Sequence, residues 1–290
     1  MDNYIIDKLR YSYAYACIRE QRMRSNDKKL DLSLKNNSKF ENLYWGKRCF
    51  IFGNGPSLKN VDFSLFRDEY TFTVNQLARN PRFPELHTNF HMWSDERFFI
   101  VDPNKPEDLE LVESMKRVRT ADNNPVVFYK YAGYNFVKQF GLDKDLDIHY
   151  FEQGYYYVSE KRDVDFTRFT PAFSTVVHYL ICLAVYMGFK EIYLLGCDCT
   201  GIVTIIDNYL NKGEDAKYAY QISENEKKRM QRVQQQSKVR DELVANVRLF
   251  DDYERLLKYC NARDVKLYNA TNPTLLDTIP KVDLMTVLKQ

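Results

Sequence analysis

A glycine-rich turn is the first segment of this sequence with the residue types of a binding site. Gly53-Asn54-Gly55-Pro56-Ser57 directly follows an apolar run at residues 48–52 that is typical of a buried strand. The glycines allow the backbone to approach a ligand closely, and Asn54 and Ser57 add side-chain hydrogen-bonding groups. The turn matches neither the dinucleotide-binding fingerprint nor a P-loop. It therefore predicts either a ligand-binding turn or a turn that uses Gly, Asn and Pro for shape alone.

Polar residues follow three further apolar runs, at residues 70–74, 90–93 and 191–195. Because the carboxyl ends of parallel strands meet at one edge of a sheet, we expect these residues to line one pocket. An asparagine there can hydrogen-bond to a base or a ribose, and a carboxylate can accept hydrogen bonds from ribose or acceptor hydroxyls. The residues at these positions are Asn75, Ser94, Asp95, Gly196 and Asp198.

The elements that must position these residues alternate between short apolar runs and helical patterns, which predicts an α/β fold with a mostly parallel central sheet. The strongest helical pattern covers residues 171–188. We expect one Rossmann-like domain at residues 47–290, with a lid-like polar insert at about residues 200–240 and an amphipathic helix at 241–260. The predicted strands are residues 48–52, 70–74, 90–93, 125–129, 191–196 and 265–268.

The N-terminal segment, residues 1–46, differs from the rest of the chain. Residues 1–24 combine apolar positions near helical spacing with several basic residues, which predicts a helix. Residues 25–39 are rich in Asn, Asp, Lys and Ser, which predicts a linker. The helix fits two interpretations: a surface helix packed on the main domain, or a helix that binds a partner or an anionic membrane surface.

The composition excludes some functional classes. The formal net charge of +2 gives no basic excess of the kind that nucleic-acid binding requires. The first ten residues carry charges and lack the apolar core of a secretory signal, and no apolar stretch reaches the ~20 residues that cross a bilayer. We expect a cytoplasmic protein, with residues 1–24 as the segment suited to peripheral contact with the inner face of the plasma membrane.

Two stretches resemble a known family. Residues 49–76, with Gly-Asn-Gly-Pro-Ser-Leu and Val-Asn-Gln, resemble the start of the small bacterial sialyltransferases that cap lipooligosaccharides. Residues 174–198 resemble the middle of the same proteins, and equally a wider pterin-pyrophosphokinase-like group that includes the sialyltransferase-like domain of motility accessory factors. The ending, at residues 265–284, also resembles that wider group. The resemblance is discontinuous and leaves out the N-terminal segment and the polar insert.

The resemblance implies a glycosyltransferase that uses a CMP-activated sugar, sialic acid or a relative, on a single Rossmann-like domain with a lid. Asn54 and Gly55 would contact the ribose and phosphate of the donor. Ser174 and Thr175 would hold its carboxylate and ribose at a helix N-terminus, which is suited to an anion. Lid tyrosines would stabilise the leaving phosphate. The full implied donor-binding set is Gly53, Asn54, Gly55, Ser57, Asn75, Ser174, Thr175, Gly196, Tyr218 and Tyr220.

The sequence departs from the family at the general base. The sialyltransferases use a lid histidine, but none of the four histidines here falls between residues 198 and 290. The base must then come from the rim of the pocket or from a distant loop, since a carboxylate at a strand end can be tuned by burial. The candidates are Asp95, which could equally be a helix cap, His149 in the Asp-Ile-His-Tyr segment taken as a loop, and Asp198.

Three functions remain open at this stage. The first is a CMP-sugar-dependent glycosyltransferase that acts on a cell-surface glycan or a lipid-linked precursor. The second is a pterin pyrophosphokinase, whose chemistry needs acidic residues that gather Mg²⁺ around ATP. The third is a non-catalytic nucleotide-sugar binding protein. No Asp-x-Asp follows a predicted strand, so we expect no required metal, although Mg²⁺ could assist through the donor phosphate.

Overall fold

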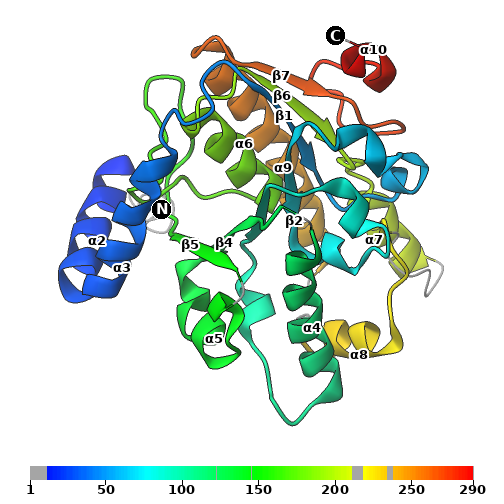
Figure 1. Cartoon of the computed structure of the whole chain (residues 1–290), viewed down its shortest axis with the longest axis horizontal. Helices are drawn as coiled ribbons and strands as arrows, with labels where there is room; N and C mark the ends of the chain where they lie inside the picture. Colours follow the sequence, from blue (N-terminus) through cyan, green and yellow to red (C-terminus); the bar gives the residue numbers. More distant parts are fainter. Residues whose placement is uncertain (1–11, 122, 145, 211–217, 234–237, 290) are drawn as a thin grey trace.

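Seven strands form one parallel sheet in the order β5-β4-β3-β2-β1-β6-β7, with helices on both faces (Figure 1). The computed structural model describes residues 12–289 apart from 122, 145, 211–217 and 234–237. Because every strand pairing is parallel and helices cover both faces of the sheet, the expected α/β class with a parallel sheet is confirmed. The strands are β1 (Arg48–Phe52), β2 (Tyr70–Val74), β3 (Phe90–Trp93), β4 (Val126–Lys130), β5 (Asp147–Phe151), β6 (Glu191–Leu195) and β7 (Lys266–Asn269).

Successive side chains of a strand point to opposite faces of the sheet, and here both faces are covered. In β1, Cys49 and Ile51 join the core on one face, while Phe50 and Phe52 join the core on the other. The first core contains α6 and α9, and the second contains α4. The helices are α2 (Tyr13–Asn26), α3 (Lys28–Lys35), α4 (Pro106–Lys116), α5 (Tyr134–Gln139), α6 (Val176–Tyr186), α7 (Gly201–Leu210), α8 (Glu224–Val233), α9 (Val239–Asn261) and α10 (Leu284–Leu288).

The strand order reverses next to β1, which pairs with β2 on one side and with β6 on the other. These three strands, all of which the sequence predicts, are therefore neighbouring inner strands of the sheet. In an open parallel sheet, ligands bind outside the carboxyl ends of the strands near such a reversal. The turn that follows β1 and the turn that follows β6 both lie at this point.

The helix predicted at residues 171–188 begins later, because residues before Val176 make other backbone contacts. The amide of Ala172 donates to the carbonyl of Tyr156, and the amide of Thr170 donates to the carbonyl of Glu152. This segment is therefore tied to the chain that follows β5, and α6 starts directly beside it. The predicted helix at 241–260 is found as α9, while α8 lies within the predicted polar insert.

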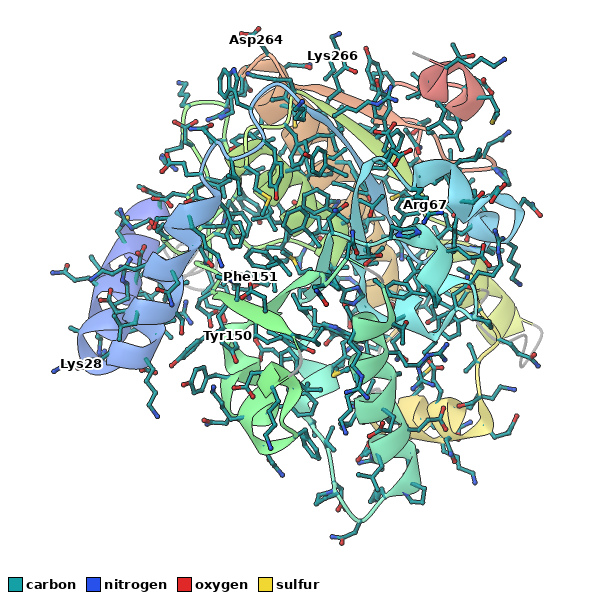
Figure 2. The ribbon with its side chains drawn as sticks, viewed as in Figure 1. Lys28, Arg67, Tyr150, Phe151, Asp264 and Lys266 are labelled. Atoms are coloured by element: carbon teal, nitrogen blue, oxygen red, sulfur yellow. The ribbon has the colours of Figure 1, made fainter. Side chains whose placement is uncertain are left out.

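The prediction of a linker at residues 25–39 is wrong. The segment forms α3 and the 3-10 turn η1 (Asn36–Phe40), and it packs against the β5 edge of the sheet, where Figure 2 labels Tyr150 and Phe151. The fully buried Asn37 donates through its amide nitrogen to the carbonyls of Tyr150 (2.8 Å) and Phe166 (2.9 Å). Asn37 is therefore a buried residue of the domain, although the polar composition around it is typical of a solvated linker.

The helix α2 packs on the domain, as the first of its two interpretations expects. Arg19 donates to the carbonyl of Gln153 at 2.8 Å, and Arg24 donates to the carbonyl of Thr167 at 3.1 Å. The buried Glu20 accepts from Arg168 at 2.7 Å. Residues 1–11 of the predicted helix lie outside the described residues. Within the part that is described, no helix is both long enough and apolar enough to span a bilayer.

The polar insert is fastened to the sheet domain by ion pairs. In α8, Arg229 pairs with the fully buried Asp108 of α4 at 2.8 Å, and Arg232 reaches the same carboxylate at 2.6 Å. Arg229 also donates to the backbone carbonyl of Arg97 at 2.6 Å. Because a buried charge is costly without a partner, this network fixes where α8 lies relative to α4.

Candidate functional site

A cavity of ≈ 500 Å³ opens at the carboxyl ends of β2, β3, β4 and β5, beside the first turn of α6. We call it the central cavity. Five residues that the sequence assigns to the site line it together: Asn75, Ser94, Asp95, Ser174 and Thr175. Gly196 and Asp198 do not line it. Three charged residues that sequence reasoning missed also line it: Glu96, Arg97 and Lys130. Lys130 had a usable signal, because it directly follows a predicted strand, as Asn75 and Ser94 do.

Asn75 is held in an unusual conformation with its amide directed at no protein partner. Its backbone φ of 44° lies in the left-handed region, which asparagine tolerates better than most residues. Its carbonyl lies 3.0 Å from Nε2 of His91, and Nδ1 of that ring lies 2.7 Å from Oγ1 of Thr73. Since a carbonyl can only accept, Nε2 carries the ring proton. The side-chain Oδ1 of Asn75 is buried and has no hydrogen-bond partner among the described residues, which makes it a candidate contact for a ligand.

The first turn of α6 faces the central cavity without a side-chain cap. Thr175 occupies the N-cap position but makes no side-chain hydrogen bond there, and Thr175 and Val176 both line the cavity. The first N–H groups of a helix have no partner within the helix and carry partial positive charge. An uncapped helix start at a cavity is therefore suited to a phosphate or a carboxylate.

Two ion pairs line the same cavity. The carboxylate of Asp95 accepts from Nε of Arg97 at 3.0 Å and from its backbone N at 2.9 Å. Asp95 thereby caps the 3-10 turn η6 (Glu96–Phe99), so it has both the cap role and the cavity position that the sequence left open. The second pair joins Lys130 and Glu96. Each of these two cations is therefore paired with a carboxylate of the same cavity.

The glycine-rich turn, for which the sequence left ligand binding and shape alone as alternatives, makes its close contacts inside the protein. The carboxylate of Asp198 accepts from the backbone N of Ser57 at 2.9 Å and from its hydroxyl at 2.7 Å. The amide of Gly53 donates to the carbonyl of Leu195, the last residue of β6. The amide of Gly55 donates to the carbonyl of Gly196, in the turn that follows β6. A Cβ on Gly55 would clash with Oδ2 of Asp198, so the glycine is required by a contact inside the protein.

None of the five residues of the turn belongs to the lining of the two cavities described here. Burial raises the pKa of Asp198, and the two hydrogen bonds from Ser57 oppose that rise. We call this contact between the turn after β1 and the turn after β6 the clasp. Gly196, with a φ of 63°, belongs to it because its carbonyl accepts from the amide of Gly55. The side chain of Asn54 takes no part in it, since its buried Oδ1 has no hydrogen-bond partner among the described residues. A donor contact by Asn54 stays a prediction.

The two lid tyrosines stack on each other, with ring centroids 5.6 Å apart. The hydroxyl of Tyr220 donates to Glu226 at 2.8 Å and is buried, so it does not point to a phosphate site in this structure. Burial raises the pKa of Tyr218, and the nearby charge of Arg97 opposes the rise. Neither tyrosine belongs to the lining of the central cavity, so their lid role stays a prediction. The backbone N of Ala219 donates to the carbonyl of Asn54 at 3.2 Å.

His149 is not the free loop histidine that the sequence suggested. It lies in β5, buried, with Nδ1 3.0 Å from Oδ1 of Asn37 and its ring against Phe40. Burial lowers its pKa to about 4. It is also absent from the cavity lining, so the structure gives it a packing role under the N-terminal helices and leaves Asp95 as the candidate base that faces the central cavity.

His178 lies in the core and has no hydrogen bond at either ring nitrogen within the described residues. Its nearest charged group is Asp252, at 3.8 Å from Nδ1. Burial lowers its pKa to about 3. The ring therefore stays neutral and packs at 4.2 Å between centroids against Tyr253.

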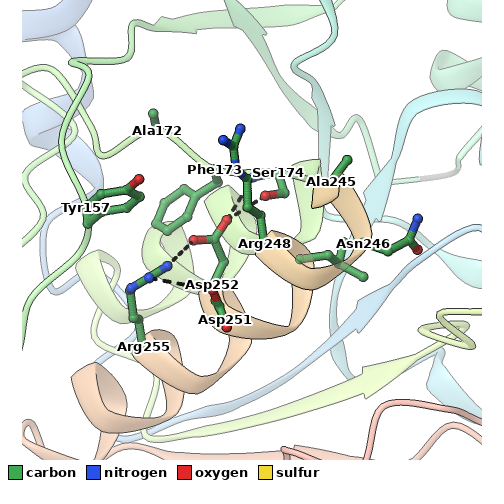
Figure 3. Close-up of a pocket in the computed structure, with 11 residues that line it drawn as sticks. Tyr157, Ala172, Phe173, Ser174, Ala245, Asn246, Arg248, Asp251, Asp252 and Arg255 are labelled. Carbon is green, nitrogen blue, oxygen red and sulfur yellow. Dashed lines mark hydrogen bonds and ion pairs between the residues drawn. The ribbon is translucent and has the colours of Figure 1, made fainter. Parts of the chain in front are cut away.

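A second cavity, of ≈ 580 Å³, shares Phe173 and Ser174 with the central cavity; we call it the side cavity (Figure 3). Its other wall is α9. Ser174, expected to hold the donor carboxylate, instead donates to Oδ2 of Asp252 through its hydroxyl at 2.7 Å and its backbone N at 3.1 Å. Sequence reasoning placed no site on α9, because the polar face of that helix resembles any solvated face.

The described residues contain no group of three or more His, Cys, Asp or Glu side chains that could hold a metal ion. Asp95 and Asp198, the acidic residues that a triphosphate-bound Mg²⁺ would need, are engaged by Arg97 and Ser57 respectively.

Comparison with known proteins gives little beyond the structure. No protein-family model matches the sequence, and no curated protein matches it. One similar solved structure is the sialyltransferase CstII from Campylobacter jejuni, in complex with the substrate analogue cytidine-5'-monophosphate. The two share 20% sequence identity with a TM-score of 0.43, over 82% of this chain and 85% of that one. A likeness of this size leaves the activity to be argued from the site itself.

The buried neutral histidines predict that the protein loses stability in mild acid. His91 and His178 have pKa values lowered by burial to about 3, whereas an unfolded histidine titrates near its usual 6.5. Below pH 6.5 the unfolded chain binds protons that the folded chain does not, so each histidine reduces stability by up to about 1.4 kcal/mol per pH unit. Urea unfolding between about pH 7.5 and 5 should show this slope, reduced by one proton in His178→Leu. An unchanged slope in that variant would contradict the assignment.

Proposed function

We propose that this chain is a glycosyltransferase that transfers a sugar, sialic acid or a related sugar, from a CMP-activated donor. The observation that carries the proposal is the central cavity, where the uncapped start of α6 and the unpartnered amide oxygen of Asn75 face the same space. The resemblance of residues 49–76 and 174–198 to bacterial sialyltransferases supports the same activity.

The chemistry of such a donor fits these groups. A CMP-activated acidic sugar carries a phosphate and a carboxylate, and the helix start of α6 offers N–H groups to one of them. The amide of Asn75 can hydrogen-bond to the nucleoside. Arg97 and Lys130 lie in the same cavity and can stabilise the negative charge that develops on the departing CMP. We propose that this charge stabilisation replaces a required metal ion.

The pyrophosphokinase alternative gains no specific observation. Its acidic residues would have to gather Mg²⁺ around a triphosphate, but the two carboxylates of the central cavity, Asp95 and Glu96, are each paired with a cation. A non-catalytic binding protein would use the same cavity, so it is distinguished by turnover alone.

The donor assignment predicts selective binding of CMP. In titration calorimetry with CMP, UDP, GDP and ATP-Mg²⁺, we expect CMP to bind most tightly. Asn75→Ala should weaken CMP binding by ~1–3 kcal/mol, because a buried polar group of the ligand loses its partner. Asn36→Ala, which changes an exposed asparagine, is the matched control. Equal CMP affinity in Asn75→Ala, or preference for ATP-Mg²⁺ in the natural chain, would overturn the assignment.

We propose Asp95 as the general base, because among Asp95, His149 and Asp198 it alone lines the central cavity. Three N–H groups of Arg97 make four contacts with the Asp95 carboxylate, because Nε lies 3.0 Å from both oxygens. We propose that the hydroxyl of an acceptor displaces one of these contacts, since its proton must leave as the new glycosidic bond forms.

Asp95→Asn should lower turnover by roughly 10²–10⁴-fold while CMP affinity changes little, since base assistance is of that size. Asp62→Asn is a close control, because Asp62 also caps a 3-10 turn but lies outside the cavity lining. Single-turnover assays and calorimetry separate the two effects. Full turnover in Asp95→Asn, or lost CMP binding, would exclude Asp95 as the base.

For the acceptor we propose a cell-surface glycan or its lipid-linked precursor at the cytoplasmic face of the membrane. Arg19 and Arg24 of α2 contact the domain, but Arg22 and Lys28 are exposed, and Figure 2 shows Lys28 at the outer edge of the molecule. Flotation with anionic liposomes should weaken with added salt and fall in the variant Arg22→Glu/Lys28→Glu. Identical flotation of both proteins would remove this segment as the attachment site.

A further inference from the structure

The side cavity has a different chemical character from the central cavity it adjoins. Its α9 wall presents Arg248, Asp251, Asp252 and Arg255, two positive and two negative side chains. Its lining includes no first residue of a described helix. Ser174, which lies just before α6, donates its backbone N–H to Asp252. A nucleotide phosphate would therefore find no excess of positive charge and no unused helix start there.

The polar groups of the side cavity are arranged as linked donors and acceptors. Figure 3 shows Asp252 between Ser174 and Arg255: Oδ2 accepts from Ser174, and Oδ1 accepts from Nη1 of Arg255 at 3.0 Å. Asn246 also lines the cavity, and its amide nitrogen donates to the carbonyl of Glu242 at 2.9 Å, which leaves its amide oxygen as an acceptor. Alternating donors and acceptors without net charge match the hydroxyl groups of a neutral sugar, since each hydroxyl both donates and accepts.

An aromatic surface completes the cavity. The ring of Tyr157 is 46% exposed and lines it, with the guanidinium of Arg255 4.6 Å from the ring centroid on one face. Phe173, which is shared with the central cavity, adds a second ring. Aromatic faces carry negative potential and attract the positively polarised C–H groups of a pyranose ring.

We propose that the side cavity is the acceptor subsite and binds a neutral, hydroxyl-rich saccharide. This inference rests on the proposed function, because it assigns the donor to the central cavity. The shared wall of Phe173 and Ser174 then separates the two substrates, and the acceptor hydroxyl reaches the donor past Ser174. Asp252 is a positioning residue in this arrangement, since it holds both Ser174 and Arg255.

The test measures saccharide binding and CMP binding separately. The probes are lactose, cellobiose and maltose, observed by saturation-transfer NMR with CMP present. We expect at least one to bind, and both Tyr157→Ala and Arg248→Ala to weaken it by about tenfold or more, as the loss of an aromatic or arginine contact does. CMP affinity should change less than about twofold in both variants. Tyr15→Ala is the matched control, because Tyr15 is 45% exposed on α2 and lines neither cavity.

Three results would overturn the proposal. The first is that the natural chain binds none of the three disaccharides. The second is that the sugar signal survives in both Tyr157→Ala and Arg248→Ala. The third is that these variants lose CMP binding, which would make the side cavity part of the nucleotide site. In the first two cases intact CMP binding would leave the proposed donor site standing, so the two proposals fail independently.

Discussion

The clasp between the turn after β1 and the turn after β6 is the contact on which the remaining structure depends. Asp198 fills the space above Gly55 and takes both hydrogen-bond donors of Ser57, so the two central strands end in one fixed unit. Strands β2 to β5 extend from this unit on one side, and β7 on the other. The central cavity forms where the first of these groups meets α6. The clasp also holds the lid, because the carbonyl of Asn54 accepts from Ala219.

The lid and the central cavity are coupled through a short series of contacts. Arg229 of α8 bonds to Asp108 and also to the backbone carbonyl of Arg97. Arg97 in turn engages both carboxylate oxygens of Asp95 at the cavity. The position of α8 therefore influences where the Asp95–Arg97 pair lies, although α8 itself contributes no residue to the cavity lining. A change in the position of α8 can thus shift the Asp95–Arg97 pair, although α8 does not contact the cavity directly.

Much of the fold followed from local patterns, because buried parallel strands are continuous apolar runs bounded by polar turns. The sequence did not predict the strand β5, because the polar residues Asp147 and His149 interrupt its apolar pattern. This strand pairs with β4 and contacts η1. The same partnership explains the failure at residues 25–39. Asn37 looks like a linker residue until its partners, more than a hundred positions away, are known. Such long-range satisfaction of a buried amide leaves no local signal.

The candidate site, like the fold, could be predicted from the sequence only in part. Asn75, Asp95 and Thr175 were brought together as expected, because topology alone places strand ends and a helix start at one edge. The glycines of the first turn indicated a close approach but could not say to what. In the folded chain the approach is to Gly196 and Asp198, not to an open cradle. The role of Tyr220 was likewise decided by Glu226, a partner that the spacing of residues does not reveal.

The place of β1 between β2 and β6 has a consequence for how the protein is made. During synthesis β1 to β5 emerge well before β6, whose last residue is Leu195. Until then β1 is an edge strand, with one row of its backbone groups unpaired. Completion of the sheet thus waits for contacts between distant segments, which form slowly. The nascent chain therefore passes through a stage in which an inner strand of the finished sheet is an open edge, which favours pairing with other chains.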